Sequence, residues 1–295
     1  MEDYHAPPPH PPPLLSFDDV QNLLSQGHLP LTLPVKLQEC MESLRLSSGK
    51  FFQQPDDVKS ATYPASHHTE SGYYDVNGEK EYVTFRRIQN ADNVTELDSL
   101  VRKMWQLTTS ILTRVLYDLS AALNIPYDAW TPLLDGCLNV PLGDVDTKLP
   151  TLLRVFKYMP NKGTAGVHTD NGLLTLCDGR DNGLQVFVPD IGDTPGYWKD
   201  ADGPTILIGD TLRILSWGRA RAGRHRVIAN NEGRSSIVFA LRASLRAPEV
   251  DLTPFGDVGN RVCPADLYKH MNSRKHNINQ RKPVKPIDES TGQVP

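Results

Sequence analysis

The chain has 295 residues, a formal net charge of −4 and a hydrophobic fraction of 39%. This length suits one large domain or two ordinary ones, and the charge argues against a basic surface for nucleic acid. No apolar stretch is long enough to cross a bilayer, which argues against an integral membrane protein. The first residues lack the basic start and apolar core of a signal peptide, so we expect a cytoplasmic protein.

Four cysteines are spread along the chain and form no CxxC pair. In a reducing compartment we expect them to be free thiols, and we expect no thiolate zinc site. Nothing in the composition predicts an oligomer, so a monomer is the default.

The N-terminal half is expected to be mainly helical. Residues 1–15 are rich in proline and are predicted to form a disordered tail. Residues 16–130 are predicted to form a helical region packing on the core. Within it, helical spacing covers 17–53, with Ser16 as a helix N-cap, and an apolar stripe near a period of 3.6 covers 94–124. The polar residues between these two stretches are expected to be loop with short strands.

After residue 150 the pattern changes to short apolar runs separated by Gly, Asp, Asn and Pro clusters. Such runs are typical of an all-β sandwich or barrel. We predict an all-β core over residues 131–262 and a C-terminal helix and tail over 263–295. Helices followed by strands define an α+β chain that is mainly β.

One strand-like run contains the sequence His168-Thr169-Asp170. Residues i and i+2 of a strand point to the same face, so the imidazole and the carboxylate converge. His225 opens another strand-like run 57 residues later. Two histidines and one carboxylate match the facial triad that binds iron(II) and leaves positions open for O₂. The alternative is a surface histidine with an aspartate neighbour at a strand end.

A second pair of polar residues also stands at positions i and i+2 of a strand-like run. Arg234 and Ser236 begin a strand nine and eleven residues after His225. A guanidinium binds a carboxylate through two hydrogen bonds, and a hydroxyl adds another donor. The pair therefore suits the distal carboxylate of a dicarboxylic acid that chelates the metal. Because Asn230-Asn231-Glu232-Gly233 precedes it, Arg234 is equally well interpreted as an exposed turn residue.

The runs HTDNGLLTL, GLQVFV, IGDTLRILSWG, HRV and RSS occur in an order and spacing that resembles a known family. The resemblance is to the iron(II)/2-oxoglutarate-dependent dioxygenases of the isopenicillin N synthase-like and plant gibberellin-oxidase type. It implies a double-stranded β-helix, or jelly roll, with a helical N-terminal part. It also implies Fe(2+) held by His168, Asp170 and His225, with 2-oxoglutarate and O₂ as cosubstrates.

The same resemblance implies roles for further residues. Arg234 and Ser236 would bind the C5 carboxylate of 2-oxoglutarate, and the run LRVFKYMP would bring Tyr158 to it. The family's asparagine in that run is Phe156 here. We expect Phe156 to narrow the cavity, and Tyr73 and Tyr74 to edge the substrate pocket.

The function that this implies is oxidation of an unactivated C–H bond of a small organic molecule, by hydroxylation, desaturation or ring closure. By analogy with the family, a role in specialised (secondary) metabolism is favoured over core metabolism. One alternative is an isopenicillin N synthase-like oxidase that uses no 2-oxoglutarate. Another is a non-catalytic jelly-roll module that binds a small acid or a protein partner.

Overall fold

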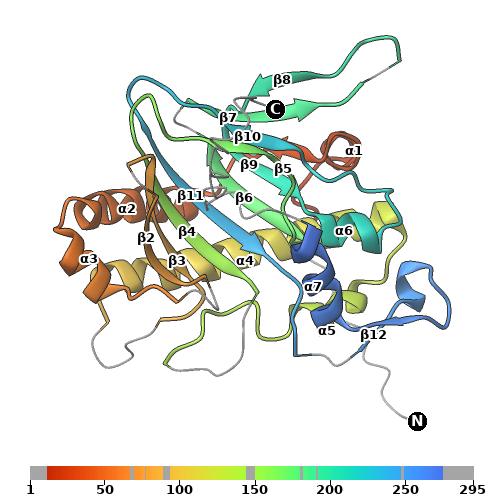
Figure 1. The fold of residues 1–295 in the computed structure, drawn as a ribbon. Helices are drawn as coiled ribbons and strands as arrows, with labels where there is room; N and C mark the ends of the chain where they lie inside the picture. The colour runs from red at the N-terminus through yellow and green to blue at the C-terminus, as the bar shows by residue number, and fades with distance from the viewer. Residues whose placement is uncertain are drawn as a thin grey trace, which may run out of the picture.

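The computed structural model describes residues 12–66, 70–76, 78–88, 94–143, 150–179, 182–190, 192–246 and 249–274. Two antiparallel sheets face each other, and helices cover the outer face of the larger one (Figure 1). The larger sheet has the strand order β1-β9-β6-β11-β4-β3-β2, and the smaller has the order β5-β10-β7-β8. This arrangement confirms the α+β, mainly β class and the double-stranded β-helix.

The larger sheet collects strands from both halves of the chain. Its members are β1 (His28–Pro30), β2 (Gly72–Val76), β3 (Lys80–Phe85), β4 (Leu152–Tyr158), β6 (Leu174–Gly179), β9 (Gly203–Ile208) and β11 (Arg234–Leu241). The smaller sheet contains β5 (Ala165–His168), β7 (Leu184–Val188), β8 (Tyr197–Asp200) and β10 (His225–Val227). A short pair, β12 (Val250–Asp251) and β13 (Arg261–Val262), lies apart from both.

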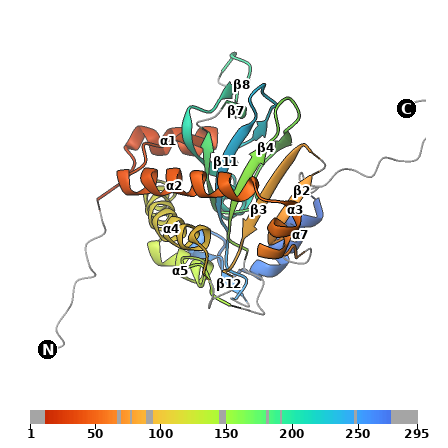
Figure 2. The same ribbon diagram turned by 90° about the vertical axis from the view of Figure 1, so that its left-hand side faces the viewer.

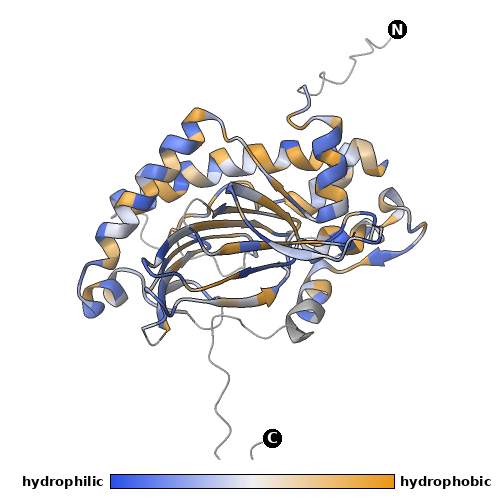
Figure 3. Ribbon diagram, turned by 90° about the horizontal axis from the view of Figure 1, so that it is seen from above, coloured by the Kyte–Doolittle hydropathy of each residue, from blue (hydrophilic) through white to orange (hydrophobic). Residues whose placement is uncertain are grey.

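The main helices pack against one face of the larger sheet (Figure 2). They are α1 (Phe17–Gln26), α2 (Val35–Phe52) and α4 (Glu96–Leu123). Shorter helices are α3 (Asp56–Thr62), η1 (Tyr127–Trp130), α5 (Thr131–Leu134), α6 (Asp210–Leu215), η2 (Thr253–Phe255) and α7 (Pro264–Arg274). Apolar and polar residues alternate around the long helices, as expected of helices with one buried side (Figure 3).

The helix ends follow the sequence signals closely. Ser16 caps α1 by accepting a hydrogen bond from the Asp19 amide, as predicted. Thr95 and Asp98 form a reciprocal capping box at the start of α4, which ends at Asn124 in the left-handed conformation. The prediction of helix over 94–124 is confirmed.

The prediction of helix over 17–53 fails in its middle. Gly27 has a φ of 81°, and a Cβ there would lie 2.7 Å from the Arg221 carbonyl oxygen, so only glycine fits this turn. The next residues form β1 and pair with β9. The strands β2 and β3 likewise join the larger sheet, so the N-terminal region contributes three strands as well as helices.

The two ends of the chain are described in part. Residues 1–11 of the predicted tail lie outside the described residues, whereas the amides of Leu14 and Leu15 both donate to the Asp118 carboxylate on α4. At the other end α7 confirms the predicted helix, and residues 275–295 lie outside the described residues. No helix among the described residues is long and apolar enough to span a membrane.

Two hydrophobic clusters form on opposite faces of the larger sheet. Leu153 and Val155 of β4 belong to the cluster beneath the helices. Phe156 and Tyr158 of the same strand belong to the cluster between the two sheets, together with residues of β7 and β10. Alternate side chains of each strand therefore face either the helices or the inter-sheet space, which we call the inner face.

Candidate metal and cosubstrate site

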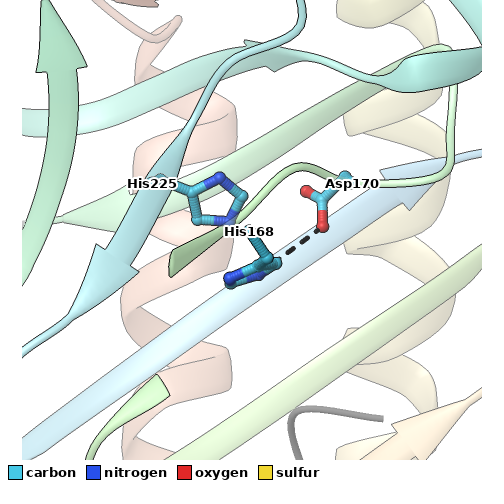
Figure 4. Close-up of side chains that lie close together, drawn as sticks. All are labelled: His168, Asp170 and His225. Carbon is cyan, nitrogen blue, oxygen red and sulfur yellow. Dashed lines mark ion pairs between the residues drawn. The ribbon is translucent and has the colours of Figure 1, made fainter. Parts of the chain in front are cut away.

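Three side chains converge between the sheets (Figure 4). His168 ends β5, Asp170 follows it, and His225 begins β10. His168 and His225 are register partners across these two strands. One potential ligand atom from each of the three residues lies within 4.8 Å of the other two, and His168 Nε2 is 4.0 Å from Asp170 Oδ1.

Backbone carbonyl groups orient both imidazole rings. His168 Nδ1 lies 2.7 Å from the Gly166 carbonyl oxygen, and His225 Nδ1 lies 3.0 Å from that of Gly223. Because a carbonyl oxygen only accepts hydrogen bonds, each neutral ring carries its proton on Nδ1. Each Nε2 then keeps its lone pair for a metal ion, as in protein metal sites where a partner fixes the histidine tautomer.

Asp170 supplies a negative charge. Burial raises the pKa of its carboxyl group, but attraction by His225 and His168 outweighs burial and lowers that pKa to about 2. The group is therefore an ionised carboxylate at neutral pH. Two neutral imidazoles and one carboxylate suit Fe(II), so the donor set fits the ion implied by the sequence.

The loop that carries Asp170 is held by the start of α6. The Asp210 amide donates to the Asp170 carbonyl oxygen over 2.7 Å, and the Thr169 hydroxyl donates to the Asp210 carboxylate over 2.8 Å. A Cβ on Gly209 would lie 2.1 Å from the Gly172 carbonyl oxygen, so the two segments approach as closely as only glycine allows. The IGD run that ends at Asp210 is the sequence signal of this support, but nothing in the run by itself links it to the metal ligands.

A second polar group lies along the first residues of β11. Arg234 is buried, and its Nη2 donates to the Asp178 carbonyl oxygen over 2.6 Å and contacts Ser236 Oγ over 3.3 Å. Its Nε and Nη1 are buried and have no hydrogen-bond partner among the described residues. A buried guanidinium with two unsatisfied N–H groups beside a hydroxyl fits the carboxylate of a bound acid, because such a ligand would satisfy both.

Tyr158 and Phe156 are the neighbours of this pair on β4. The register places Tyr158 opposite Arg234 and Phe156 opposite Ser236. Tyr158 and Arg234 also line an open groove of about 910 Å³. The predicted residues around the cosubstrate position therefore lie together, on the inner face of two neighbouring strands.

The structure separates the two tyrosines that were expected to edge the substrate pocket. Tyr74 stacks on Tyr82 on the inner face, with ring centroids 5.1 Å apart. Tyr73 points to the other face, where its hydroxyl donates to the Glu81 carboxylate and its ring packs on Phe51. Successive strand residues cannot share a face, so the expectation for Tyr73 is corrected and that for Tyr74 remains.

Comparison with known proteins agrees with this architecture. Residues 150–243 match the 2OG-Fe(II) oxygenase superfamily. A 2-oxoglutarate-dependent dioxygenase of Gibberella zeae is 38% identical over 106 residues, which are 33% of this chain and 29% of that protein. Gibberellin 2-beta-dioxygenase 4 of Arabidopsis thaliana is 24% identical over 71% of this chain and 70% of its own length. The first of these matches thus spans less than a third of its relative.

Solved structures share the fold. A full-length Neurospora crassa protein in complex with alpha-KG aligns with a TM-score of 0.65 and 18% identity, over 86% of this chain and 88% of that one. Dioxygenase for auxin oxidation 1 from Arabidopsis thaliana aligns with a TM-score of 0.60 and 19% identity, over 78% of this chain and 88% of that one. Residues 150–243, which carry the His-Asp-His cluster, therefore belong to the 2OG-Fe(II) oxygenase superfamily.

Proposed function

We propose that the protein is a 2-oxoglutarate-dependent dioxygenase that oxidises an unactivated C–H bond of a small organic molecule. The reaction would be hydroxylation, desaturation or ring closure in secondary metabolism. The observation that carries the proposal is the pairing of two sites: a metal-binding triad and, on the facing sheet, a buried arginine with two unsatisfied N–H groups.

In this proposal His168, Asp170 and His225 hold Fe(II). The iron supplies the oxidising chemistry with O₂ and 2-oxoglutarate. Arg234 and Ser236 bind the distal carboxylate of 2-oxoglutarate, with Tyr158 beside them. The apolar residues between the sheets exclude water from the reacting groups.

The arrangement at Arg234 suits the carboxylate of a bound acid, and a requirement of turnover for 2-oxoglutarate distinguishes this function from an oxidase that uses none. Arg234 begins β11, where Asp178 and Ser236 fix its guanidinium on the inner face. An acid held there can extend toward the triad on the smaller sheet. Relatives named for gibberellin and for homoarginine oxidation share the fold region but differ in substrate, so their substrates are not transferred here.

The test is 2-oxoglutarate turnover by purified protein reconstituted with Fe(II). We expect succinate formation that requires iron, O₂ and 2-oxoglutarate together, and we expect it to be lost in His168→Ala and Asp170→Asn. Asp128→Asn makes the same change at an exposed carboxylate of η1 that is not one of the three candidate ligands. This matched control should keep the activity. Succinate formation that is unchanged in both triad variants would overturn the proposal.

A further inference from the structure

A second group of arginines lies on the inner face, away from Arg234. Arg154 is in β4, Arg242 directly follows β11, and Arg86 directly follows β3. Arg234 and Arg242 are eight residues apart along one strand direction, which corresponds to about 26 Å of extended chain. Arg242 is therefore too far from Arg234 to share a carboxylate with it, and Arg154, whose register partner is Val238, lies about 13 Å from Arg234 along the strand.

Arg154 is held by a hydroxyl and two aromatic rings. Its Nε donates to Thr84 Oγ1 over 2.7 Å, and its guanidinium lies 5.1 Å from the ring centroid of Tyr82 and 5.7 Å from that of Phe156. No carboxylate among the described residues lies within ion-pair distance of it, although Glu70 attracts it electrostatically from farther away. Burial lowers the pKa of Arg154, and attraction by Tyr82 and Glu70 does not offset the effect of burial.

Arg242 adds a second guanidinium of the same kind. Its Nη1 contacts the Tyr268 hydroxyl of α7 over 2.9 Å, and its Nε is buried without a partner among the described residues. Arg86 is close enough to repel both of these arginines electrostatically. Arg86 itself donates to the Pro150 carbonyl oxygen over 2.6 Å and lies 3.5 Å from the Glu70 carboxylate. Glu70 offsets part of the charge of these three neighbouring cations, and a further anion would lower the cost of withdrawing the remaining positive charge from water.

Arg242 lies toward the metal ligands, and Arg154 lies against aromatic side chains. Arg242 attracts the Asp170 carboxylate electrostatically, which places it on the triad's side of the inner face. Tyr82 and Phe156, which flank Arg154, have ring centroids 5.4 Å apart. Tyr74 extends this aromatic cluster by stacking on Tyr82. The Tyr82 and Phe156 rings are tilted by 45° to each other, and this aromatic cluster continues directly from the cationic group.

We propose that Arg154 and Arg242 bind the carboxylate of the primary substrate, and that this substrate is a flat, aromatic or conjugated carboxylic acid lying along Tyr82 and Phe156. A planar carboxylate matches two guanidinium groups in geometry and charge, which a neutral ligand would not. That the bound acid is the substrate to be oxidised rests on the function proposed above. The binding site itself can be tested separately.

The experiment measures binding by calorimetry without turnover. Protein loaded with Mn(II) and saturated with 2-oxoglutarate under nitrogen is titrated with benzoate, cinnamate and 2-naphthoate, and with their methyl esters. We expect at least one acid to bind and its ester to bind at least about 10-fold more weakly, because the ester loses a charge-assisted hydrogen bond. Failure of every acid to bind, or equal binding of acid and ester, would overturn the inference.

Variants assign the binding to this group. Arg154→Gln should weaken the acid about 10-fold to 100-fold, and Arg154→Lys should weaken it less because the charge remains. Arg102→Gln removes an exposed arginine of α4 and should leave the affinity unchanged. Thermal unfolding checks that the variants fold, and the ester comparison needs no variant. An affinity that is unchanged in Arg154→Gln would overturn the inference.

The 2-oxoglutarate affinity of the same proteins separates this inference from the proposed function. We expect Arg154→Gln to keep that affinity and Arg234→Gln to lose it. If Arg234→Gln kept it, the proposed function would fail while the aromatic acid site stood. If only Arg154→Gln lost it, Arg154 would be the 2-oxoglutarate anchor and the present inference would fail.

Discussion

His168 and His225 are direct partners across β5 and β10, with ring centroids 4.1 Å apart. Their Nδ1 atoms are each held by a carbonyl two residues earlier in the chain. The smaller sheet therefore fixes the separation and the tautomer of both rings before any metal binds. This preorganisation leads to the first prediction.

Metal binding should stabilise the folded protein. A ligand at about 100 times its Kd stabilises the native state by about 2.7 kcal/mol, which for a domain of this size raises Tm by about 5 °C. We expect Mn(II), added anaerobically, to give this shift in the wild type and no shift in His225→Ala. Differential scanning fluorimetry with and without a chelator measures it. An equal shift in His225→Ala would contradict the assignment of this ligand.

Replacing Arg234 or Ser236 should weaken the binding of 2-oxoglutarate more than it lowers kcat. Arg234→Lys keeps the charge but loses the two-point contact, so we expect KM for 2-oxoglutarate to rise about 10-fold. Ser236→Ala should raise KM by a smaller factor. Ser235→Ala is the matched control, because the neighbouring residue of the same strand faces the helices. Steady-state succinate assays give the values, and a larger KM change in Ser235→Ala would contradict the assignment.

A buried ion pair joins α2 to β6, the strand whose Asp178 carbonyl oxygen accepts a hydrogen bond from Arg234. Arg45 pairs with the Asp178 carboxylate, whose side chain is 0% exposed. Arg45→Met would remove an ion-pair partner of that buried charge, so we expect a loss of about 3 kcal/mol in the free energy of unfolding. The double variant Arg45→Met/Asp178→Leu should recover most of it.

Urea unfolding measures both variants of this pair. The control is Arg261→Met, which breaks the exposed pair with Glu249 and should cost less than about 1 kcal/mol. Equal losses in Arg45→Met and Arg261→Met would show that burial of the Arg45–Asp178 pair has no energetic consequence.

Lys80 should make stability depend on pH. It is buried beside Tyr158, and burial lowers its pKa from 10.5 to about 8. Between these two values the unfolded chain binds the proton and the folded chain does not, so stability rises with pH across this window. Below pH 8 the folded protein carries the full cost of a buried charge.

Lys80→Met tests this linkage. Relative to the variant, the wild type should gain about 3 kcal/mol between pH 8 and pH 10.5. Taking the difference between the two proteins removes the titration of other groups. Urea unfolding across the range measures it, and a difference that does not change with pH would show that Lys80 stays charged in the folded state.

Local patterns made several features predictable. The capping signals at Ser16 and Thr95 depend on neighbours within four residues, so the sequence contains all the information that they need. The parity of Arg234 and Ser236 follows from the strand period of two in the same way, whereas Asp170 lies in the loop after β5 and reaches His168 through that loop. The candidate triad and the cosubstrate pair were therefore predictable as groups.

The sequence by itself thus determined the superfamily, the candidate iron ligands and the candidate cosubstrate pair, because each rests on short-range periodicity or on a motif. Only the tertiary structure decided which strand face lies between the sheets, and hence that Tyr74 faces inward and Tyr73 does not. It also decided that Arg242 contacts Tyr268 and lies close enough to Arg154 to interact with it electrostatically. The physical reason is that these residues come from separate elements, brought together by sheet pairing and by packing of α7, which no local pattern encodes.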